Sequence, residues 1–349
     1  MSSTRNRVTV FIVVVLVCAA IGVGYIAHAQ KENPKHGKSQ QPTTDSARQL
    51  RAYMQQPHIL FRNTDLGAAY GMASVTPLTN PTTTRAATSL DCDRVAMTNG
   101  IGVCMHTNQG VVTTYEAKIF DSSFHVTHTI ALPGLPSRAR VSPNGHWVAM
   151  TTFVRGDSYA GTNFSTRTQF LDTATGRFAV ANLETGFTVT DNGSKVTAPS
   201  RNYWGVTWAA DSDHFYATLD VNYTDIHLIE GQLSTRTAHT MEPNVECPSL
   251  SPDQTRIAYK KRTGGTFTAL AWRLHVLDLA TGRDVALTET RSVDDQVEWL
   301  NNRTVLYALP RLTSGSVAYD TYQVPADGSG TPTIYIKGAQ SPAVAVRGT

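Results

Sequence analysis

Residues 139–150, ARVSPNGHWVAM, place an apolar segment on each side of a tight polar turn. Residues 248–259, PSLSPDQTRIAY, repeat this order with the same Ser-Pro start to the turn. Proline presets the backbone angle at the second turn position, and asparagine or aspartate tolerates the angle needed at the next one. Each stretch therefore predicts two antiparallel strands joined by a short turn.

A second hairpin pattern occurs downstream of each of these copies. Residues 170–177, FLDTATGR, match residues 276–283, VLDLATGR, in sequence and spacing. Looser copies of the first pattern lie at residues 88–97, 206–217 and 297–308, and degenerate copies of the second lie at residues 120–123, 233–236 and 324–329. The chain after residue 85 therefore holds five units of two hairpins each.

The spacing of these units predicts the architecture. Two hairpins make a four-stranded sheet, and units that recur about every 40 to 65 residues have the period of propeller blades. Residues 58–62 and 70–75 lack a leading strand, whereas the apolar residues 343–346 remain after the fifth unit. If this last strand joins the first ones in one sheet, the ring closes with no exposed edge. We expect an all-β, six-bladed β-propeller over residues 58–349, because the chain has too few strands for seven blades.

The Ser-Pro-Asp/Asn turn before an apolar strand, followed by the Leu-Asp-x-x-Thr-Gly hairpin, resembles the TolB-like six-bladed propeller family. The resemblance covers residues 58 to about 346, and two of the units keep Ser-Pro. It implies a fold found in the ligand-binding half of a bacterial envelope protein and in the non-catalytic gate domain of some serine peptidases. The motifs therefore indicate the fold far more than a function.

The amino terminus has the features of a membrane segment. Residues 8–27 carry no charge and follow Arg5 and Arg7, and a stretch of about 20 apolar residues spans a bilayer. We expect residues 1–29 to form a cytoplasmic stub and a transmembrane signal anchor, with the propeller outside the cytoplasm. The alternative is a signal peptide cleaved after Ala29, because residues 27–29 have a small-x-small pattern, and the protein is then secreted.

Residues 30–57 are predicted to be a flexible linker that contains a short helix over residues 47–55. Beyond residue 28 the basic and acidic side chains nearly balance. Because phosphate binding normally needs a concentrated basic face, this balance argues against nucleic acid as the main partner.

The cysteines beyond the amino-terminal segment are Cys92, Cys104 and Cys247. Cys92 and Cys104 are expected on neighbouring strands of one blade, around a turn at residues 98–100. Outside the cytosol they can form a disulfide, and the alternative is two unpaired buried thiols. Cys247 precedes a predicted strand and is expected to be a core thiol.

A search for catalytic and metal-binding patterns finds no HExxH, CxxC, GxSxG or Gly-rich phosphate loop. We therefore predict no catalytic residue, no metal site and no cofactor.

The long connections suggest a binding face. The short motif turns share one face of the ring, so the long connections at residues 155–167, 184–203, 262–271 and 310–319 are expected on the opposite face. Trp204 has no counterpart in other units, unlike Trp208 and Trp299, which are expected to pack between blades. Aromatic, amide and guanidinium groups suited to a partner are predicted there: Tyr159, Asn163, Phe164, Arg201, Tyr203, Trp204, Tyr223 and Arg262.

Two classes of function follow. The favoured one is a membrane-tethered binding or scaffolding propeller that recognises a protein, a peptide or a cell-envelope glycan through the face of the long connections. The alternative is an extracytoplasmic hydrolase, lyase or cyclase with its site at the mouth of the central channel. Acids or histidines converging on that mouth favour the enzyme, whereas a surface without shifted ionisable groups favours binding.

Overall fold

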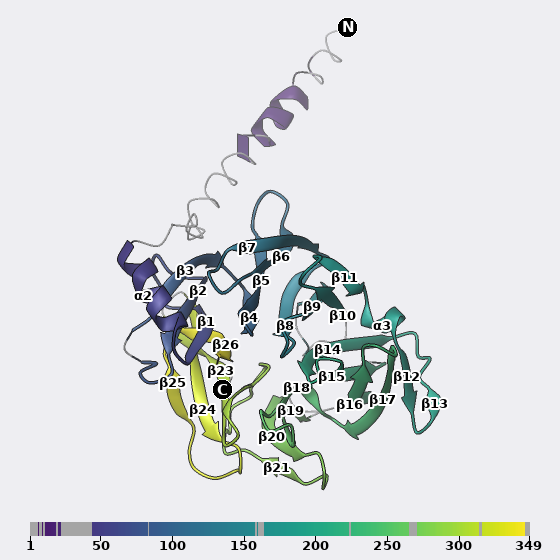
Figure 1. The fold of residues 1–349 in the computed structure, drawn as a ribbon. Coiled ribbons are helices and arrows are strands. Elements are labelled where there is room, and N and C mark those ends of the chain that lie inside the picture. The colour runs from purple at the N-terminus through teal and green to yellow at the C-terminus, as the bar shows by residue number, and fades with distance from the viewer. Residues whose placement is uncertain are drawn as a thin grey trace. The chain divides into compact units, whose positions relative to one another are not determined.

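Six sheets surround a common centre in the computed structural model (Figure 1). The structure describes residues 6, 9, 11–18, 20, 21, 44–82, 84–157, 159, 164–222, 225–264, 271–313 and 316–345. The chain divides into two units, Met1–Gln40 and Gln41–Thr349, and the sheets belong to the second. The predicted six-bladed propeller is therefore confirmed.

The first three blades contain four strands each. Blade 1 consists of β1 (His58–Asn63), β2 (Met72–Pro77), β3 (Ala86–Asp91) and β26 (Ala339–Ala345). Blade 2 consists of β4 (Arg94–Thr98), β5 (Ile101–Asn108), β6 (Thr114–Phe120) and β7 (Val126–Leu132). Blade 3 consists of β8 (Leu135–Val141), β9 (Trp147–Arg155), β10 (Ser165–Asp172) and β11 (Arg177–Val180).

The other three blades follow the same order, with one extension. Blade 4 consists of β14 (Arg201–Trp208), β15 (His214–Val221), β16 (Asp225–Gln232) and β17 (Thr237–Pro243), extended by β12 (Thr188–Asp191) and β13 (Ser194–Lys195). Blade 5 consists of β18 (Glu246–Leu250), β19 (Arg256–Thr263), β20 (Ala271–Asp278) and β21 (Asp284–Ala286). Blade 6 consists of β22 (Glu298–Asn301), β23 (Thr304–Thr313), β24 (Ser316–Pro325) and β25 (Thr333–Ile336).

The ring closes as the sequence predicts. Strand β26 pairs antiparallel with β1, and His58 lies opposite Ala345. The last strand thus leads blade 1 and covers the edge that β1 would otherwise expose. The innermost strands around the ring are β26, β4, β8, β14, β18 and β22.

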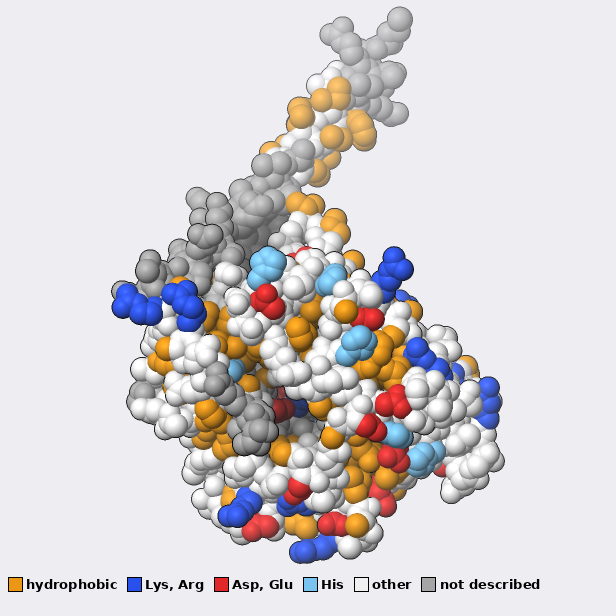
Figure 2. All heavy atoms as spheres, viewed as in Figure 1, with side chains coloured by type: hydrophobic (Ala, Val, Ile, Leu, Met, Phe, Trp, Pro, Cys, Tyr) orange, Lys and Arg blue, Asp and Glu red, His pale blue; other side chains and the backbone are white. Residues whose placement is uncertain are grey.

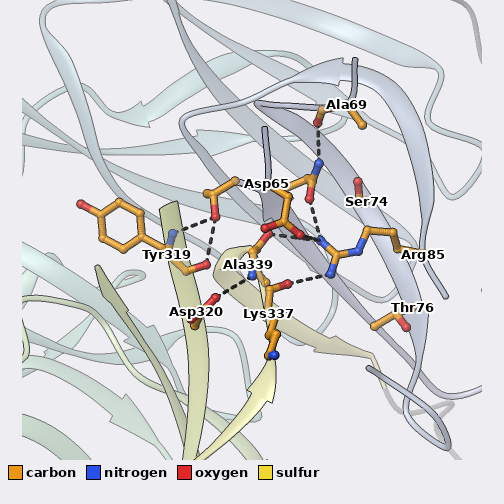
Figure 3. Close-up of polar contacts among 12 residues, drawn as sticks. Asp65, Ala69, Ser74, Thr76, Arg85, Tyr319, Asp320, Lys337 and Ala339 are labelled. Atoms are coloured by element: carbon orange, nitrogen blue, oxygen red, sulfur yellow. Dashed lines mark hydrogen bonds and ion pairs between the residues drawn. The ribbon is translucent and has the colours of Figure 1, made fainter. Parts of the chain in front are cut away.

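Polar contacts between blades 1 and 6 reinforce this closure (Figure 3). The Arg85 guanidinium donates to Asn63 Oδ1 at 2.6 Å and to the Lys337 carbonyl at 2.6 Å. On the other side, Asp320 Oδ1 accepts the backbone N–H of Gly338 at 2.8 Å. Strands from the two ends of the propeller are therefore held by side chains as well as by the β-ladder.

The first predicted hairpin, at residues 88–97, is assigned wrongly by the sequence. Its first half belongs to β3, the outermost strand of blade 1, and its second half to β4, the innermost strand of blade 2. A short polar turn between apolar strands looks the same whether it joins strands within a blade or links two blades.

Two of the predicted long connections are not open loops. Strand β23 continues to Thr313 and β24 starts at Ser316, so residues 310–313 and 316–319 form paired strands and not an open loop. Residues 184–203 contain most of the helix α3 (Leu183–Gly186), the hairpin β12–β13 and the start of β14. Strand β12 pairs in parallel with β17 and so covers the outer edge of blade 4.

The helix expected over residues 47–55 is α2 (Thr44–Met54), whose Leu50 packs in the core shared by blades 1 and 2. In the part of the chain that the structure describes, no helix is both long and apolar enough to cross a bilayer. Residues 27–29, which carry the predicted cleavage site, lie outside the described residues.

Candidate functional site

The long-loop face is the face that carries the connections after β1, β5, β9, β15, β19 and β23. Antiparallel connectivity places these six connections together, opposite the short motif turns. The sequence predicted an exposed aromatic surface there.

That exposed surface is not present. The side chains of Tyr159, Phe164, Tyr203 and Trp204 are buried. The connection after β9 brings Tyr159 inward, where its ring lies 4.8 Å from that of Trp204. Both rings belong to an apolar cluster between blades 3, 4 and 5, so they act as core residues at this face.

Strand β14 explains why Tyr203 and Trp204 are buried. Residues 201–208 were treated in part as loop, but they form the innermost strand of blade 4. Side chains alternate along a strand, so Tyr203 and Trp204 enter two different clusters: Tyr203 packs in the core of blades 3 and 4, and Trp204 packs in the cluster that holds Tyr159 and Phe164. Arg201 donates to the carbonyls of Val196 and Glu184 and so fixes the connection that covers blade 4.

The remaining predicted residues have other positions. Arg262 is partly buried and pairs through Nε with Glu246, a fully buried carboxylate. Glu246 also accepts from the indole N–H of Trp272 at 2.9 Å. Asn163 and Tyr223 lie outside the described residues.

Cys92 and Cys104 form a disulfide. Cys104 lies on β5 of blade 2, whereas Cys92 lies in the connection between β3 and β4. The bond therefore links the exit of blade 1 to blade 2, which differs from the expected position within one blade. Cys247 is an unpaired, buried thiol, as the sequence predicted.

A cluster of charges that includes two buried cations, Lys260 and Arg138, lies beside Tyr159. Lys260 has no exposed surface, and its Nζ lies 2.5 Å from Asp294 Oδ1 and 4.7 Å from the centre of the Tyr159 ring. Arg138 Nη2 reaches the same Asp294 oxygen at 3.2 Å. Burial raises the pKa of Asp294, but the Lys260 and Arg138 cations outweigh burial and hold that pKa at about 2. Asp294 is thus an ionised bridge between two cations.

Side chains from opposite blades meet across the channel. Blades 3 and 6 are three positions apart in the ring of six, and Asp294 lies in the segment that leads from blade 5 into β22 of blade 6, so its contact with Arg138 on β8 spans the channel. Arg140 crosses in the same way, to the Val297 carbonyl at 2.6 Å and to Glu298 at 3.0 Å. The channel is therefore bridged by ion pairs between β8 and the segment before β22.

The sequence analysis missed this segment, residues 287–297. Gln296 extends the bridge by donating to the carbonyls of Val206 at 3.0 Å and Pro248 at 3.2 Å, on blades 4 and 5. The signal available in the sequence was the length of the connection between two units and its Asp294-Asp295-Gln296 run.

A pocket of about 250 Å³ lies at the long-loop end of the channel. Blades 1, 2, 3 and 6 contribute its lining: Arg94, Arg138, Phe153, Asp157, Tyr159, Ser292, Asp294, Asp295, Ala308, Leu309, Pro310, Tyr319 and Gln340. Figure 2 shows the propeller in the view of Figure 1, with a hollow at the centre of the ring.

The opposite end of the channel holds a pocket of about 390 Å³ beside the short turns. Its charged groups are Arg140 and Glu298, which pair with each other. Glu298 also accepts the backbone N–H of Val344 at 3.3 Å. Because these charges are already paired, the long-loop end is the better candidate for binding.

The long-loop face also carries exposed apolar side chains. Among the described propeller residues, every exposed large apolar side chain except Ile334 lies on or beside a connection of the long-loop face. We call them the apolar rim: Leu66, Val111, Val112, Val154, Leu312 and Val317. They come from blades 6, 1, 2 and 3, the same consecutive blades that line the pocket.

Metal ligands are not gathered anywhere in the described residues, since no group of three or more His, Cys, Asp or Glu side chains is placed to hold an ion. The long-loop pocket also contains no histidine in its described lining.

No family model and no curated protein sequence matches the chain. Among solved structures, TolB from Acinetobacter baumannii is 15% identical, with a TM-score of 0.56 over 83% of this chain and 67% of that chain. A protein assigned as TolB from Agrobacterium tumefaciens is 9% identical, with a TM-score of 0.46 over 82% of this chain and 90% of that one. A puromycin-hydrolyzing peptidase from Mycobacterium tuberculosis is 11% identical, with a TM-score of 0.47 over 80% of this chain and 43% of that one.

The similarity to the Acinetobacter protein, at this level of identity, concerns the fold alone. It agrees with the closed ring of six blades and with the repeated turn motifs. The chain has the fold of a TolB-like six-bladed β-propeller.

Proposed function

We propose that this protein is an extracytoplasmic binding or scaffolding propeller that recognises a polypeptide partner through its long-loop face. The observation that carries the proposal is the coincidence of the apolar rim with the charged pocket on the same four blades. Gathered apolar side chains that remain exposed mark interaction surfaces. A pocket on the same face as such side chains can serve as the anchor site of a protein interface, and the side chains add contact area.

The exposed chemistry favours a polypeptide over a glycan. The rim consists of valine and leucine side chains, which bury well against other apolar side chains. A sugar ring is commonly bound against exposed aromatic side chains, but the aromatic residues predicted for this face, Tyr159 and Trp204 among them, are buried in the core.

Catalysis is the weaker alternative. Asp294 in the pocket is held ionised by two cations, which makes it both a poor proton donor and a weak base near neutral pH. Ser292 is the pocket's serine, and its Oγ accepts the backbone N–H of Trp272 at 3.1 Å, with no histidine in the described lining to activate it. The site thus has fixed charges but lacks a paired nucleophile and base.

Capture from cell-envelope extract with the full-length chain tests the binding face. The variant carrying Val112→Asp and Leu312→Asp places two charges on the rim, at side chains that are 75% and 84% exposed, so the fold should be retained. We expect a partner that wild type captures to bind this variant about tenfold more weakly or worse.

The matched control is Ala174→Asp, which adds a charge to an exposed turn on the opposite face. It should retain the partner at wild-type strength. Equal capture by wild type and the rim variant would falsify the proposal, and so would a partner lost equally from the control.

A further inference from the structure

We infer that Arg94 is an anchor for a carboxylate group of the bound polypeptide, in the pocket at the long-loop end of the channel. The inference rests on the proposed function and names the chemistry that its central pocket recognises.

Arg94 begins β4, the innermost strand of blade 2, and lines the pocket. Its guanidinium makes no hydrogen bond or ion pair with any other residue that the structure describes, whereas Arg138 in the same pocket is paired with Asp294. A guanidinium carries five N–H donors in a fixed plane. Arg94 therefore offers a full set of donors to a ligand.

The neighbouring Arg138 also favours the binding of an anion in this pocket. Its Nε is buried without a hydrogen-bond partner, although its terminal nitrogens bond to Ser137 and Asp294. Burial, together with the positive charge of Arg138, lowers the pKa of Arg94. An anion placed between the two guanidinium groups would relieve this repulsion.

Two of the three acids that line the pocket, Asp294 and Asp295, are already engaged. Asp294 accepts from Lys260 and Arg138, and Asp295 Oδ2 accepts the backbone N–H of Ala308 at 3.0 Å. These bonds hold both carboxylates in place, so they are not free to turn and pair with Arg94. With Asp157, the lining carries three acidic side chains against the two guanidinium groups of Arg94 and Arg138.

That residual negative charge selects the kind of anion. A carboxylate carries one charge and matches the two parallel N–H donors of a guanidinium. A phosphate carries close to two charges at neutral pH and meets stronger repulsion from Asp157, Asp294 and Asp295. The pocket therefore fits a carboxylate better than a phosphate.

The apolar wall indicates what accompanies the carboxylate. Phe153, Leu309 and Pro310 line the same cavity of about 250 Å³. This volume accommodates one residue of a polypeptide, so the carboxylate belongs either to a chain end or to an acidic side chain. Both sources present the same chemistry to Arg94.

Titration of the full-length chain with small probes, followed by NMR, separates these sources. N-acetyl-leucine carries a chain-terminal carboxylate, N-acetylglutamic acid α-amide carries a side-chain carboxylate, and N-acetyl-leucinamide is the neutral match of the first. We expect at least one carboxylate probe to bind wild type about tenfold more tightly than the neutral probe does. Whichever of the two carboxylate probes binds more tightly shows whether the carboxylate comes from a chain end or from an acidic side chain.

Arg94→Gln should remove this preference for the charged probe. The matched control Arg303→Gln changes an exposed arginine on the opposite face and should keep it. Arg94→Gln should also melt no lower than wild type, because the change removes a charge that Arg138 repels. This second measurement distinguishes a binding arginine from a structural one.

Three results overturn the inference: Arg94→Gln keeps the preference, inorganic phosphate binds as tightly as the carboxylate probes, or Arg94→Gln melts several degrees lower. The proposed function is tested separately, by the capture experiment with the rim variant. The rim variant can lose its partner while Arg94→Gln binds both carboxylate probes as tightly as wild type does. This result would support the proposed binding face and contradict the role of Arg94 as a carboxylate anchor.

Discussion

Asp220 is a buried acid with unsatisfied hydrogen-bonding capacity. It lies on β15 with no exposed surface, and its Oδ1 has no hydrogen-bond partner. Burial raises its pKa to about 6, although Arg262 and the amide of Asn202 act in the other direction. The folded protein therefore binds this proton more tightly than the unfolded chain does, where the pKa is near 3.8.

The pH dependence of stability follows from that difference. Between pH 3.8 and about 6 the folded state holds more protons than the unfolded state, so the contribution of Asp220 falls as pH rises through this window. A shift of two units corresponds to about 3 kcal/mol, which is lost at neutral pH.

Asp220→Asn should therefore raise the free energy of unfolding at pH 7.5 by up to about 3 kcal/mol, because a neutral amide carries no desolvated charge. At pH 4 wild type and variant should differ much less. Urea unfolding at both pH values measures this, and an equal difference at the two pH values would contradict the assignment.

Tyr159 and Trp204 show where prediction from the sequence failed at the level of single residues. Tyr159 and Trp204 were assigned to a binding surface because large aromatic residues are common at interfaces. They are just as common in cores, and burial decides between the two. The order of residues in a loop does not reveal whether that loop folds over the ring or projects from it.

At the scale of elements, the disulfide between Cys92 and Cys104 joins two blades across the connection that follows β3. It closes a short loop, with a sequence separation of 12 residues. A bond of this kind stabilises the fold mainly by restricting the unfolded chain.

Replacing both cysteines, Cys92→Ser with Cys104→Ser, should lower the free energy of unfolding by about 3 kcal/mol. Urea unfolding of wild type with and without reductant should show a loss of similar size. The double variant provides the control, since reductant should leave its stability unchanged. A wild-type protein insensitive to reductant would show that the two sulfurs are not bonded.

Element boundaries were the part of the fold that sequence placed least well. The hairpins at residues 139–150 and 248–259 are present as β8–β9 and β18–β19, because their turn chemistry is local. The pattern at residues 88–97 was split between two blades, since its turn residues do not encode which sheet each strand joins.

At the scale of the whole molecule, the ring depends on contacts between the two ends of the propeller. Gly338 at the turn before β26 has a φ of +62°, and a Cβ there would lie 2.1 Å from the carboxyl carbon of Asp65. Thr64 adds to this contact by accepting the backbone N–H of Tyr319 at 2.9 Å. The close approach holds β26 beside β1, so the ring has no open edge.

Attachment to a membrane is the remaining whole-molecule prediction. We propose that residues 8–27 anchor the protein in the membrane, with the propeller outside the cytoplasm, because their 20 uncharged residues exceed the apolar length usual in a cleaved signal.

The mature protein should then sediment with membranes after carbonate extraction and retain the residues before Ala29. Amino-terminal sequencing of the native protein checks this. A mature chain that begins at Gln30 would instead support secretion after cleavage.

The sequence by itself determined the number of blades, the closure by the last strand and the presence of a core around Trp208 and Trp299. These features follow from turn chemistry, alternation and repetition, which act over a few residues and recur along the chain. Only the tertiary structure decided where the charges meet. Arg138 pairs with Asp294, 156 residues away, because blades 3 and 6 face each other across the channel. No local pattern encodes that pairing, so the site at the channel mouth emerges only when the ring is closed.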